Sequence, residues 1–169
     1  GRFLPLQSPV GIPGDSTLYY LKATVHAKRA CEDKGEMDAM EFYDLLQKRM
    51  KRVKIHDSFL SRAVNVGFSG GEKKRFEILQ MELLRPRFAV LDETDSGLDV
   101  DALRIVSEGV NRLHDETDAG FLLITHYARI LRYIKPDYVH VFVDGRVVAA
   151  GGPDLAARLE EEGYDRYLA

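Results

Sequence analysis

Apolar side chains return at helical spacing in the first third of the chain. A helix is expected over residues 17–31, with Ser16 or Thr17 as its N-cap and one apolar stripe: Leu18, Leu21 and Val25. A second helix is expected over residues 37–54, where one face carries five apolar side chains: Met40, Tyr43, Leu46, Met50 and Val53. Its basic residues, Lys48-Arg49 and Lys51-Arg52, are expected to face solvent. The first fifteen residues, rich in proline and glycine, are typical of a loop.

After residue 67 the pattern changes from helical spacing to short apolar runs. Residues 88–91 and 121–124 are wholly apolar, as expected of parallel strands that are buried on both faces. Apolar side chains return at helical spacing over about 100–114, between the two runs. Strand, helix and strand in this order predict a βαβ unit.

The end of the chain predicts a hairpin and a helix. Residues 138–143 alternate between apolar and polar side chains, and residues 146–150 form a second apolar segment. Asp144-Gly145, between them, is the strongest two-residue hairpin signal. A last short helix is expected over 154–161. The patterns together predict an α/β fold, with a helical first third followed by a mostly parallel sheet.

Composition narrows the class of protein. The 169 residues are 45% hydrophobic and 30% charged, with a net charge of −3. These values are typical of a soluble globular protein, and they disfavour nucleic-acid binding, which usually needs a basic face. Cys31 is the single cysteine, so an internal disulfide and a cysteine-ligated iron–sulfur cluster are both excluded. The chain starts at Gly1 rather than methionine, and we therefore expect it to be a piece of a longer protein.

Polar residues follow both apolar runs directly. The first run leads into Asp92-Glu93, and the second leads into Thr125-His126. Ligands of an open parallel sheet bind just beyond the carboxyl ends of its strands, so these side chains converge if the two strands are neighbours. An aspartate there is suited to hold Mg²⁺, and the adjacent glutamate to orient or deprotonate a water molecule. Taken alone, Asp92-Glu93 is equally compatible with the start of an ordinary turn.

A serine and two glycines stand before a third helix. Ser69-Gly70-Gly71 precedes a helix that is expected to begin near Glu72 or Lys73. Small residues at a helix N-terminus let backbone N–H groups and the helix dipole approach a phosphate. Taken alone, the tripeptide fits a flexible loop with a serine N-cap better, and the segment 96–99 fits an ordinary turn.

Five motifs in a fixed order give the chain its resemblance to the ATP-binding cassette (ABC) ATPases. They are the Q-loop glutamine Gln7, the signature motif Phe68–Glu72, the Walker B strand Phe88–Glu93, the D-loop Ser96–Asp99 and the switch histidine His126. The resemblance covers nearly the whole chain and implies a P-loop NTPase-type ABC ATPase domain that is partial. It implies four parts: residues 1–7 as the end of the N-terminal core, 8–66 as the helical subdomain, 67–150 as the α/β core, and 151–169 as the C-terminal helix.

Longer stretches resemble the SufC subfamily, the soluble ATPases of the SUF machinery for iron–sulfur cluster assembly. The similar stretches are Gln7–Gly14, Asn65–Arg75, Ile78–Met81, Asp92–Asp99 and Tyr133–Val141. Thr94-Asp95 stands where most transporter ATPases carry Pro-Thr, and Glu72 stands where they carry glutamine. Phe76 departs from the subfamily, which usually has a polar residue at that position.

The resemblance implies a head-to-tail dimer in which each ATP lies between two copies. Ser69, Gly70 and Gly71 would contact the γ-phosphate of the ATP that is bound by the other copy. Asp99 would bridge the two copies.

The resemblance also implies roles at the carboxyl ends of the strands. Asp92 would hold Mg²⁺ through water, and Glu93 would activate the attacking water. His126 would contact the γ-phosphate. Gln7 would sense Mg²⁺ and couple hydrolysis to the partner protein. The implied cofactors are ATP and Mg²⁺.

The phosphate-binding (Walker A) loop of the family, Gly-x-x-x-x-Gly-Lys-Ser/Thr, does not occur in these 169 residues. We therefore expect the chain to be the C-terminal part of a longer SufC-like ATPase and to be inactive alone. The implied partners are SufB- and SufD-like soluble scaffold proteins, in the cytoplasm or a plastid stroma, without nucleic acid or membrane insertion. The alternatives are the ATPase subunit of a membrane transporter and a non-catalytic piece that binds a partner.

Overall fold

The structure is a computed structural model that describes residues 2–4, 11–163 and 167. The chain forms two compact units, Gly1–Ile124 and Thr125–Ala169, and each is described by itself. Both units combine helices with strands, as expected of the α/β class.

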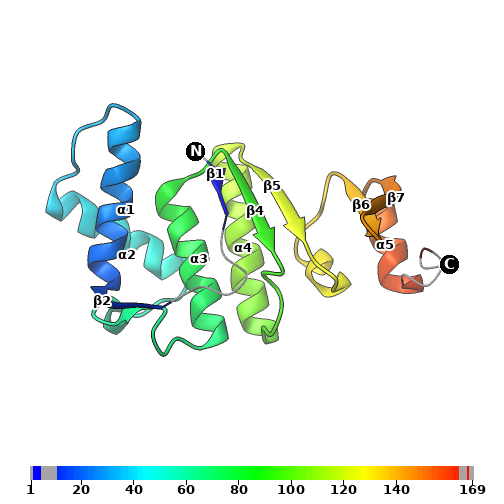
Figure 1. The fold of residues 1–169 in the computed structure, drawn as a ribbon, viewed down its shortest axis with the longest axis horizontal. Coiled ribbons are helices and arrows are strands. Elements are labelled where there is room, and N and C mark those ends of the chain that lie inside the picture. The colour runs from blue at the N-terminus through cyan, green and yellow to red at the C-terminus, as the bar shows by residue number, and fades with distance from the viewer. Residues whose placement is uncertain (1, 5–10, 164–166, 168–169) are drawn as a thin grey trace. The chain divides into compact units, whose positions relative to one another are not determined.

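A three-stranded parallel sheet belongs to the first unit (Figure 1). Its order is β1-β4-β5, with β1 at Arg2–Phe3, β4 at Phe88–Asp92 and β5 at Gly120–Ile124. Helix α4, Val100–Thr117, connects β4 to β5, and these two strands pair in parallel along their full length. The predicted βαβ unit is therefore confirmed.

The expectation that both predicted strands are buried on both faces is wrong. Ala89 and Leu91 of β4 are buried, but Phe88 is exposed, and so are Leu122 and Ile124 of β5. Exposure alternates along β5, which means that only one face of this strand is covered. A wholly apolar run hides this difference, because its side chains are of one kind on both faces.

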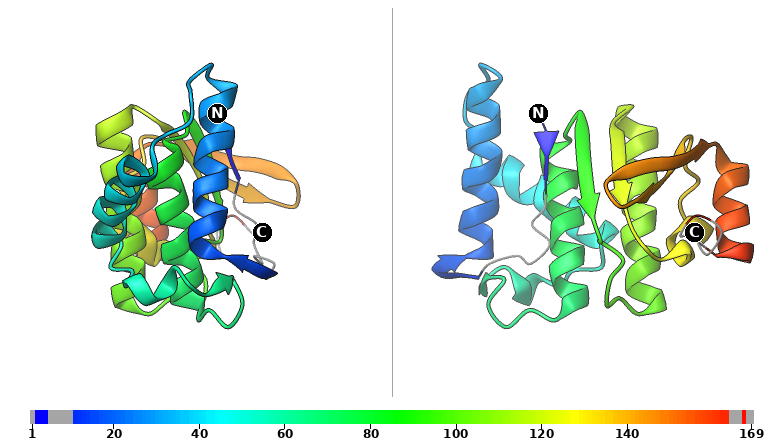
Figure 2. Two further views of the ribbon diagram at one scale, coloured as in Figure 1. Left: turned by 90° about the vertical axis from the view of Figure 1, so that its left-hand side faces the viewer. Right: turned by 45° about the vertical axis from the view of Figure 1, so that its right-hand side comes forward.

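Three further helices complete the first unit. They are α1 at Thr17–Cys31, α2 at Ala39–Arg52 and α3 at Gly70–Leu84. Helices α1 and α2 pack against α3, and α3 packs against α4. The right-hand view of Figure 2 shows α3 between α1 and α4. Ser16 caps α1 as predicted, because its hydroxyl accepts the N–H of Tyr19 at 3.3 Å.

Helix α2 buries a different face from the one that the spacing predicts. Met40 and Tyr43 are exposed, whereas Phe42 is buried together with Leu46 and Met50. Side chains four positions apart stack on one face of a helix, and the buried three follow that rule. The spacing therefore predicted the helix correctly and the first part of its buried face incorrectly.

Two short strands were not predicted. One lies mostly in the first fifteen residues, where a loop was expected, and the other lies near residue 63, where no strand was expected. Strand β2, Ile12–Ser16, pairs antiparallel with β3, Ala63–Val64, in an irregular register. A 3-10 turn at Asp57–Phe59 precedes β3. The loop expectation is therefore wrong for β1 and β2. Each of them pairs with a segment far away in the sequence, which local composition does not reveal.

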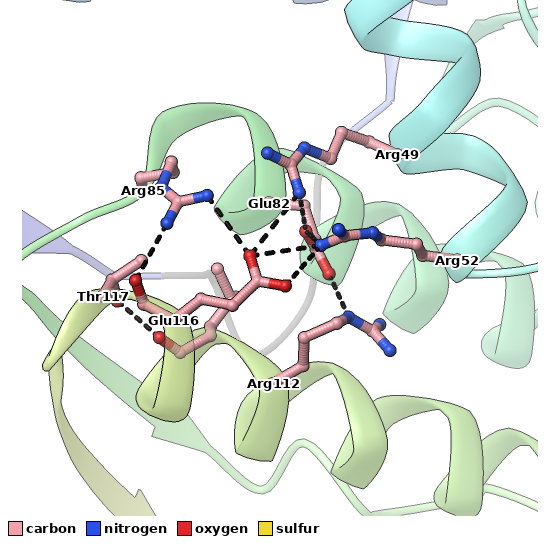
Figure 3. Close-up of polar contacts among 8 residues, drawn as sticks. Arg49, Arg52, Glu82, Arg85, Arg112, Glu116 and Thr117 are labelled. Carbon is pink, nitrogen blue, oxygen red and sulfur yellow. Dashed lines mark hydrogen bonds and ion pairs between the residues drawn. The ribbon is translucent and has the colours of Figure 1, made fainter.

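A network of ion pairs joins α2, α3 and α4 (Figure 3). Glu82 of α3 has a fully buried side chain, and three arginines contact it at 2.8–3.3 Å: Arg49, Arg52 and Arg112. Glu116 of α4 also contacts three arginines: Arg49, Arg52 and Arg85. Two carboxylates thus tie together the ends of three helices.

This network corrects the expectation for the basic cluster of α2. Lys48 and Lys51 are exposed, as predicted. Arg52 is exposed as well, although it also contacts Glu116. Arg49 instead keeps only 14% of its side chain exposed, beside Glu82. Their partners come from distant parts of the sequence, so the pattern of α2 alone could not separate the two kinds of basic residue.

The second unit contains a hairpin packed against a helix. Strand β6 is Val139–Val143, β7 is Arg146–Gly151 and α5 is Pro153–Glu162. Asp144 and Gly145 connect the strands with positive φ angles of 46° and 77°, as a type I′ turn requires. The hairpin and the last helix are therefore confirmed. A 3-10 turn at Ala128–Arg132 precedes them, and the core is formed by Val141, Leu155 and Leu159.

None of the helices within the described residues combines the length and the apolar character that crossing a bilayer requires.

Candidate functional site

Most of the site residues predicted from the sequence gather at one end of the first unit. Helices α3 and α4 begin at the end where β4 and β5 finish (Figure 1). This end carries six of the predicted site residues: Ser69, Gly70 and Gly71 from the start of α3, Asp92 and Glu93 from the end of β4, and Asp99 from the start of α4. Gln7 lies outside the described residues, and His126 belongs to the second unit.

Strand β4 ends directly after Asp92. Asp92 stands opposite Ile124 at the last position of the parallel ladder. Glu93 has a left-handed backbone, with φ of 46°, and its N–H donates to the Ile124 carbonyl at 2.9 Å. This conformation is uncommon for a residue other than glycine and concentrates at turns and functional sites. Both residues are partly exposed at the end of the strand.

The turn after Glu93 is anchored by buried residues. Thr94 and Asp95 are fully buried. The N–H of Ser96 donates to the Glu93 carbonyl at 3.0 Å, and Gly97 supplies a positive φ of 69°. Packing therefore fixes the backbone on which Glu93 stands. The sequence distinguished Thr94-Asp95 only as a mark of a subfamily and did not indicate that the pair is buried.

His126 follows β5 and is exposed. Its ring centroid lies 3.9 Å from that of Tyr127. Strands β4 and β5 are neighbours, which confirms the adjacency on which the expected crevice depends. The convergence of His126 with Asp92 and Glu93 stays a prediction, because the histidine belongs to the other unit.

Ser69 starts α3 through a reciprocal pair of hydrogen bonds. Its hydroxyl oxygen accepts the N–H of Glu72 at 3.2 Å, and the Glu72 carboxylate accepts the N–H of Ser69 at 2.7 Å. This capping box places the start of α3 at Gly70, two or three residues earlier than expected. Among the described residues, no acceptor is found for the N–H groups of Gly70 and Gly71. They therefore remain available at the positive end of the helix dipole.

Arg62 holds this turn and was missed by the sequence analysis. Its guanidinium donates to Glu72 Oε1 at 2.6 Å and to the Gly67 carbonyl at 2.8 Å. Hydrogen bonds from Arg62 and from the Ser69 N–H keep the pKa of the Glu72 carboxyl below its usual value. No spacing motif connects residues 62 and 72, so only the fold reveals the contact.

Phe76 of α3 is the residue at which the sequence differs from the resemblance described above. Phe76 is buried, and its ring packs against Tyr20, Phe59 and Phe68, with centroids 5.8–6.1 Å apart. The unusual phenylalanine is therefore a core residue. On the next position of the same helix, burial raises the pKa of Glu77, and the Lys74 ammonium 3.3 Å away opposes that rise.

Asp99 caps the neighbouring helix. Its carboxylate accepts the N–H of Ala102 at 2.7 Å, in the first turn of α4. A Cβ placed on Gly71 would lie 3.6 Å from the Cβ of Ala102, so the first turns of α3 and α4 are side by side. Two positive helix ends thus adjoin at the edge of the unit.

This arrangement suits a phosphorylated ligand. Free N–H groups at a helix N-terminus bind phosphate oxygens, and a carboxylate at a strand end binds a hard cation. Within the described ranges, no three His, Cys, Asp or Glu side chains gather as ligands for a metal ion. A cation here would therefore need phosphate or water to complete its ligands, which is the usual way in which Mg²⁺ binds.

Close relatives exist among curated proteins, although no family model matches the chain. A probable ATP-dependent transporter of Synechocystis is 54% identical over 98% of this chain. One of Cyanophora paradoxa is 52% identical over 98%, and the probable ATP-dependent transporter SufC of Escherichia coli is 49% identical over 97%. The chain spans 64%, 63% and 66% of the lengths of these relatives, slightly less than two thirds.

Solved structures share the fold. The ATP-binding subunit of an ABC transporter matches with a TM-score of 0.69 at 24% identity, over 96% of this chain and 62% of that one. An ATP-binding cassette in a dimeric post-hydrolysis state with ADP and Pi matches with a TM-score of 0.73 at 18% identity, over 90% and 62%. The described α/β arrangement is therefore that of ATP-binding cassettes.

Proposed function

Because the chain belongs to the ATP-binding cassette ATPases and is SufC-like, we propose that the whole protein binds and hydrolyses ATP. The observation that carries this proposal is the 49–54% identity to SufC and its relatives over 97–98% of the chain. The site supports it, because hydrolysis of a phosphoanhydride needs oriented donors, a cation and one base rather than covalent chemistry.

ATP and Mg²⁺ fit the residues present. A Cβ on Gly70 would meet nothing within 4 Å, so a phosphate has open access to the first turn of α3. Asp92 offers a carboxylate that can hold Mg²⁺ through water, because Mg²⁺ usually keeps several of its waters beside the phosphate oxygens. When bound, Mg²⁺ stabilises the negative charge of the phosphates.

Each residue at this end then has a task that its chemistry can perform. Ser69, Gly70 and Gly71 donate hydrogen bonds to the γ-phosphate of an ATP held by a second copy. The Ser69 hydroxyl oxygen accepts the backbone N–H of Glu72, which leaves the hydroxyl proton to be donated outward. Glu93 orients the attacking water and takes its proton, while Asp92 holds Mg²⁺ through water.

Three residues complete the proposed two-copy site. Asp99 bridges the copies, His126 contacts the γ-phosphate, and Gln7 senses Mg²⁺ and couples hydrolysis to the partner. The dimeric state named for a similar cassette supports a pair of copies. The adjoining first turns of α3 and α4 support it as well, because they present Gly71 and Asp99 on one edge.

Within this class of ATPases we propose a role in iron–sulfur cluster assembly, with SufB- and SufD-like soluble scaffold proteins in the cytoplasm or a plastid stroma. The relative named SufC supports this assignment. The second candidate is the ATPase subunit of a membrane transporter, because the relatives are named as ATP-dependent transporters. Purification of the whole protein with its partner separates the two: a soluble scaffold supports the first, and a membrane permease alone contradicts it.

The Glu93→Gln variant of the whole protein tests the proposed chemistry. Loss of a general base slows turnover by on the order of a hundredfold or more. Phosphate release should fall by that factor, while equilibrium binding of ATP should stay unchanged. Glu108→Gln, an exposed position on α4, is the matched control and should hydrolyse ATP normally. Normal phosphate release by Glu93→Gln would remove Glu93 from its role.

A further inference from the structure

Arg62 makes contacts at both ends of the signature turn, which we define as residues 67–72. One guanidinium nitrogen contacts Glu72 Oε1 at 2.6 Å, and the other contacts the Gly67 carbonyl at 2.8 Å. The planar fork of arginine can make two such bonds at once, which a lysine ammonium cannot match in geometry. A single side chain therefore brackets the turn.

An aromatic platform fixes the direction of that fork. The Arg62 guanidinium carbon lies 4.6 Å from the ring centroid of Phe68 and 5.3 Å from that of Phe59. Both rings are buried, and their centroids are 4.2 Å apart. Stacking over two rings restricts the arginine to few orientations, so its hydrogen bonds are made from a preset position.

The effect of Arg62 passes through Glu72 to the donors of α3. Glu72 uses one oxygen for Arg62 and the other mainly for the Ser69 N–H, at 2.7 Å. With Ser69 and Glu72 paired in this way, the N–H groups left at the helix start are those of Gly70 and Gly71. The orientation of Glu72 thus determines which donors a phosphate meets.

The backbone of Arg62 is also anchored. Its carbonyl accepts both the N–H and the hydroxyl of Thr17, each at 2.9 Å, and Thr17 is fully buried at the start of α1. Hydrogen bonds therefore connect the residue that brackets the signature turn to the start of α1.

We propose that Arg62 is a positioning residue for the signature turn, which sets the Gly70 and Gly71 N–H groups toward the nucleotide bound by a second copy. This inference rests on the proposed ATPase function. It adds a residue that is proposed to touch neither the nucleotide nor the attacking water, and to act only through Glu72 and Gly67.

The chain contains a matched control for this role. The Arg62–Glu72 pair has side chains that are each 34% exposed, and the Arg85–Glu116 pair has side chains 36% and 34% exposed. Arg85 follows the opposite end of the same helix, α3. Ion pairs with this exposure contribute little to global stability, so a functional effect that only the Arg62 variant shows is not a stability effect.

The test compares Arg62→Met, Arg62→Lys and Arg85→Met in the whole protein that also carries Glu93→Gln, so that bound ATP is not consumed. We expect a single copy of the Arg62→Met variant to bind ATP with normal affinity. The ATP-driven association of two copies should weaken about tenfold. Arg62→Lys should be intermediate, and Arg85→Met should associate normally. Normal association of Arg62→Met, or equal weakening by Arg62→Met and Arg85→Met, overturns the inference.

Amide hydrogen exchange separates this inference from the function on which it rests. Arg62→Met should speed exchange at residues 68–72 without speeding it in α4, and unchanged exchange there overturns the inference by itself. If two copies of the parent protein do not associate when ATP is added, the proposed function fails. The exchange result alone then decides the role of Arg62.

Discussion

Replacing Glu82 by glutamine removes the central charge of the ion-pair network while keeping the size of the side chain. The Glu82 side chain is 0% exposed and contacts Arg112 at 2.8 Å, Arg49 at 3.1 Å and Arg52 at 3.3 Å. Removing one partner of a buried ion pair costs about 3–5 kcal/mol, because the remaining charge is left uncompensated. The arginine side chains keep 14–35% of their exposure, so water relieves part of this cost and we expect about 3 kcal/mol.

Urea unfolding of the chain, followed by circular dichroism, measures this effect. For a slope of about 1–3 kcal/mol per molar urea, the midpoint should fall by roughly 1–3 M. Glu116→Gln is the control, because Glu116 also contacts three arginines but is 34% exposed. Its midpoint should shift far less, and high salt should reduce the shift further. Equal shifts for the two variants would refute the argument that burial makes the difference.

Three further predictions concern Gly109, Glu72 and the Walker A motif. A methyl group on Gly109 would overlap Ile78 Cγ2 between α3 and α4, so Gly109→Ala should lower the free energy of unfolding in urea by about 1–3 kcal/mol. Gly35→Ala is the control, because a Cβ there meets nothing within 4 Å. Equal unfolding midpoints for the two variants would contradict this prediction. Arg62 and the Ser69 N–H lower the pKa of Glu72 from 4.5. The contribution of Glu72 to stability is small, because the pair is one-third exposed; it is complete above pH 4.5 and is lost as pH falls through the lowered pKa. Glu72→Gln should remove this part of the acid loss in a series of unfolding midpoints against pH, and an unchanged series would contradict the assignment. The 169 residues contain no Gly-x-x-x-x-Gly-Lys-Ser/Thr, so calorimetry should detect no ATP binding to this chain alone, and tight binding would refute that expectation.

The elements that the sequence predicted well are those with local signals. Ser16 marked the start of α1, and the Asp144-Gly145 pair marked the hairpin of the second unit. Both signals act within a few residues: a side chain accepts a nearby N–H, or a two-residue turn demands positive φ. The parallel pair of β4 and β5 was also predictable, because its apolar runs flank a helix of the right length.

The features that the sequence could not reveal depend on distant partners. Strand β2 forms because it pairs with β3. Arg49 is largely shielded from solvent because it forms an ion pair with the buried Glu82. At the candidate site, Asp92 and Ser69 were recognisable from their motifs, whereas Arg62 has no motif and acts through a contact with Glu72. Tertiary partners thus decided burial and charge pairing, which local patterns do not encode.

The central claim is that each hydrolytic site combines Glu93 of one copy with the signature turn of another. Mixing two inactive variants of the whole protein, Ser69→Arg and Glu93→Gln, measures this directly through phosphate release. Each variant alone should be inactive. Random pairing restores one complete site in the mixed pairs, so the mixture should regain roughly a quarter of the parent activity. A mixture that forms mixed pairs and stays as inactive as either variant would contradict the claim.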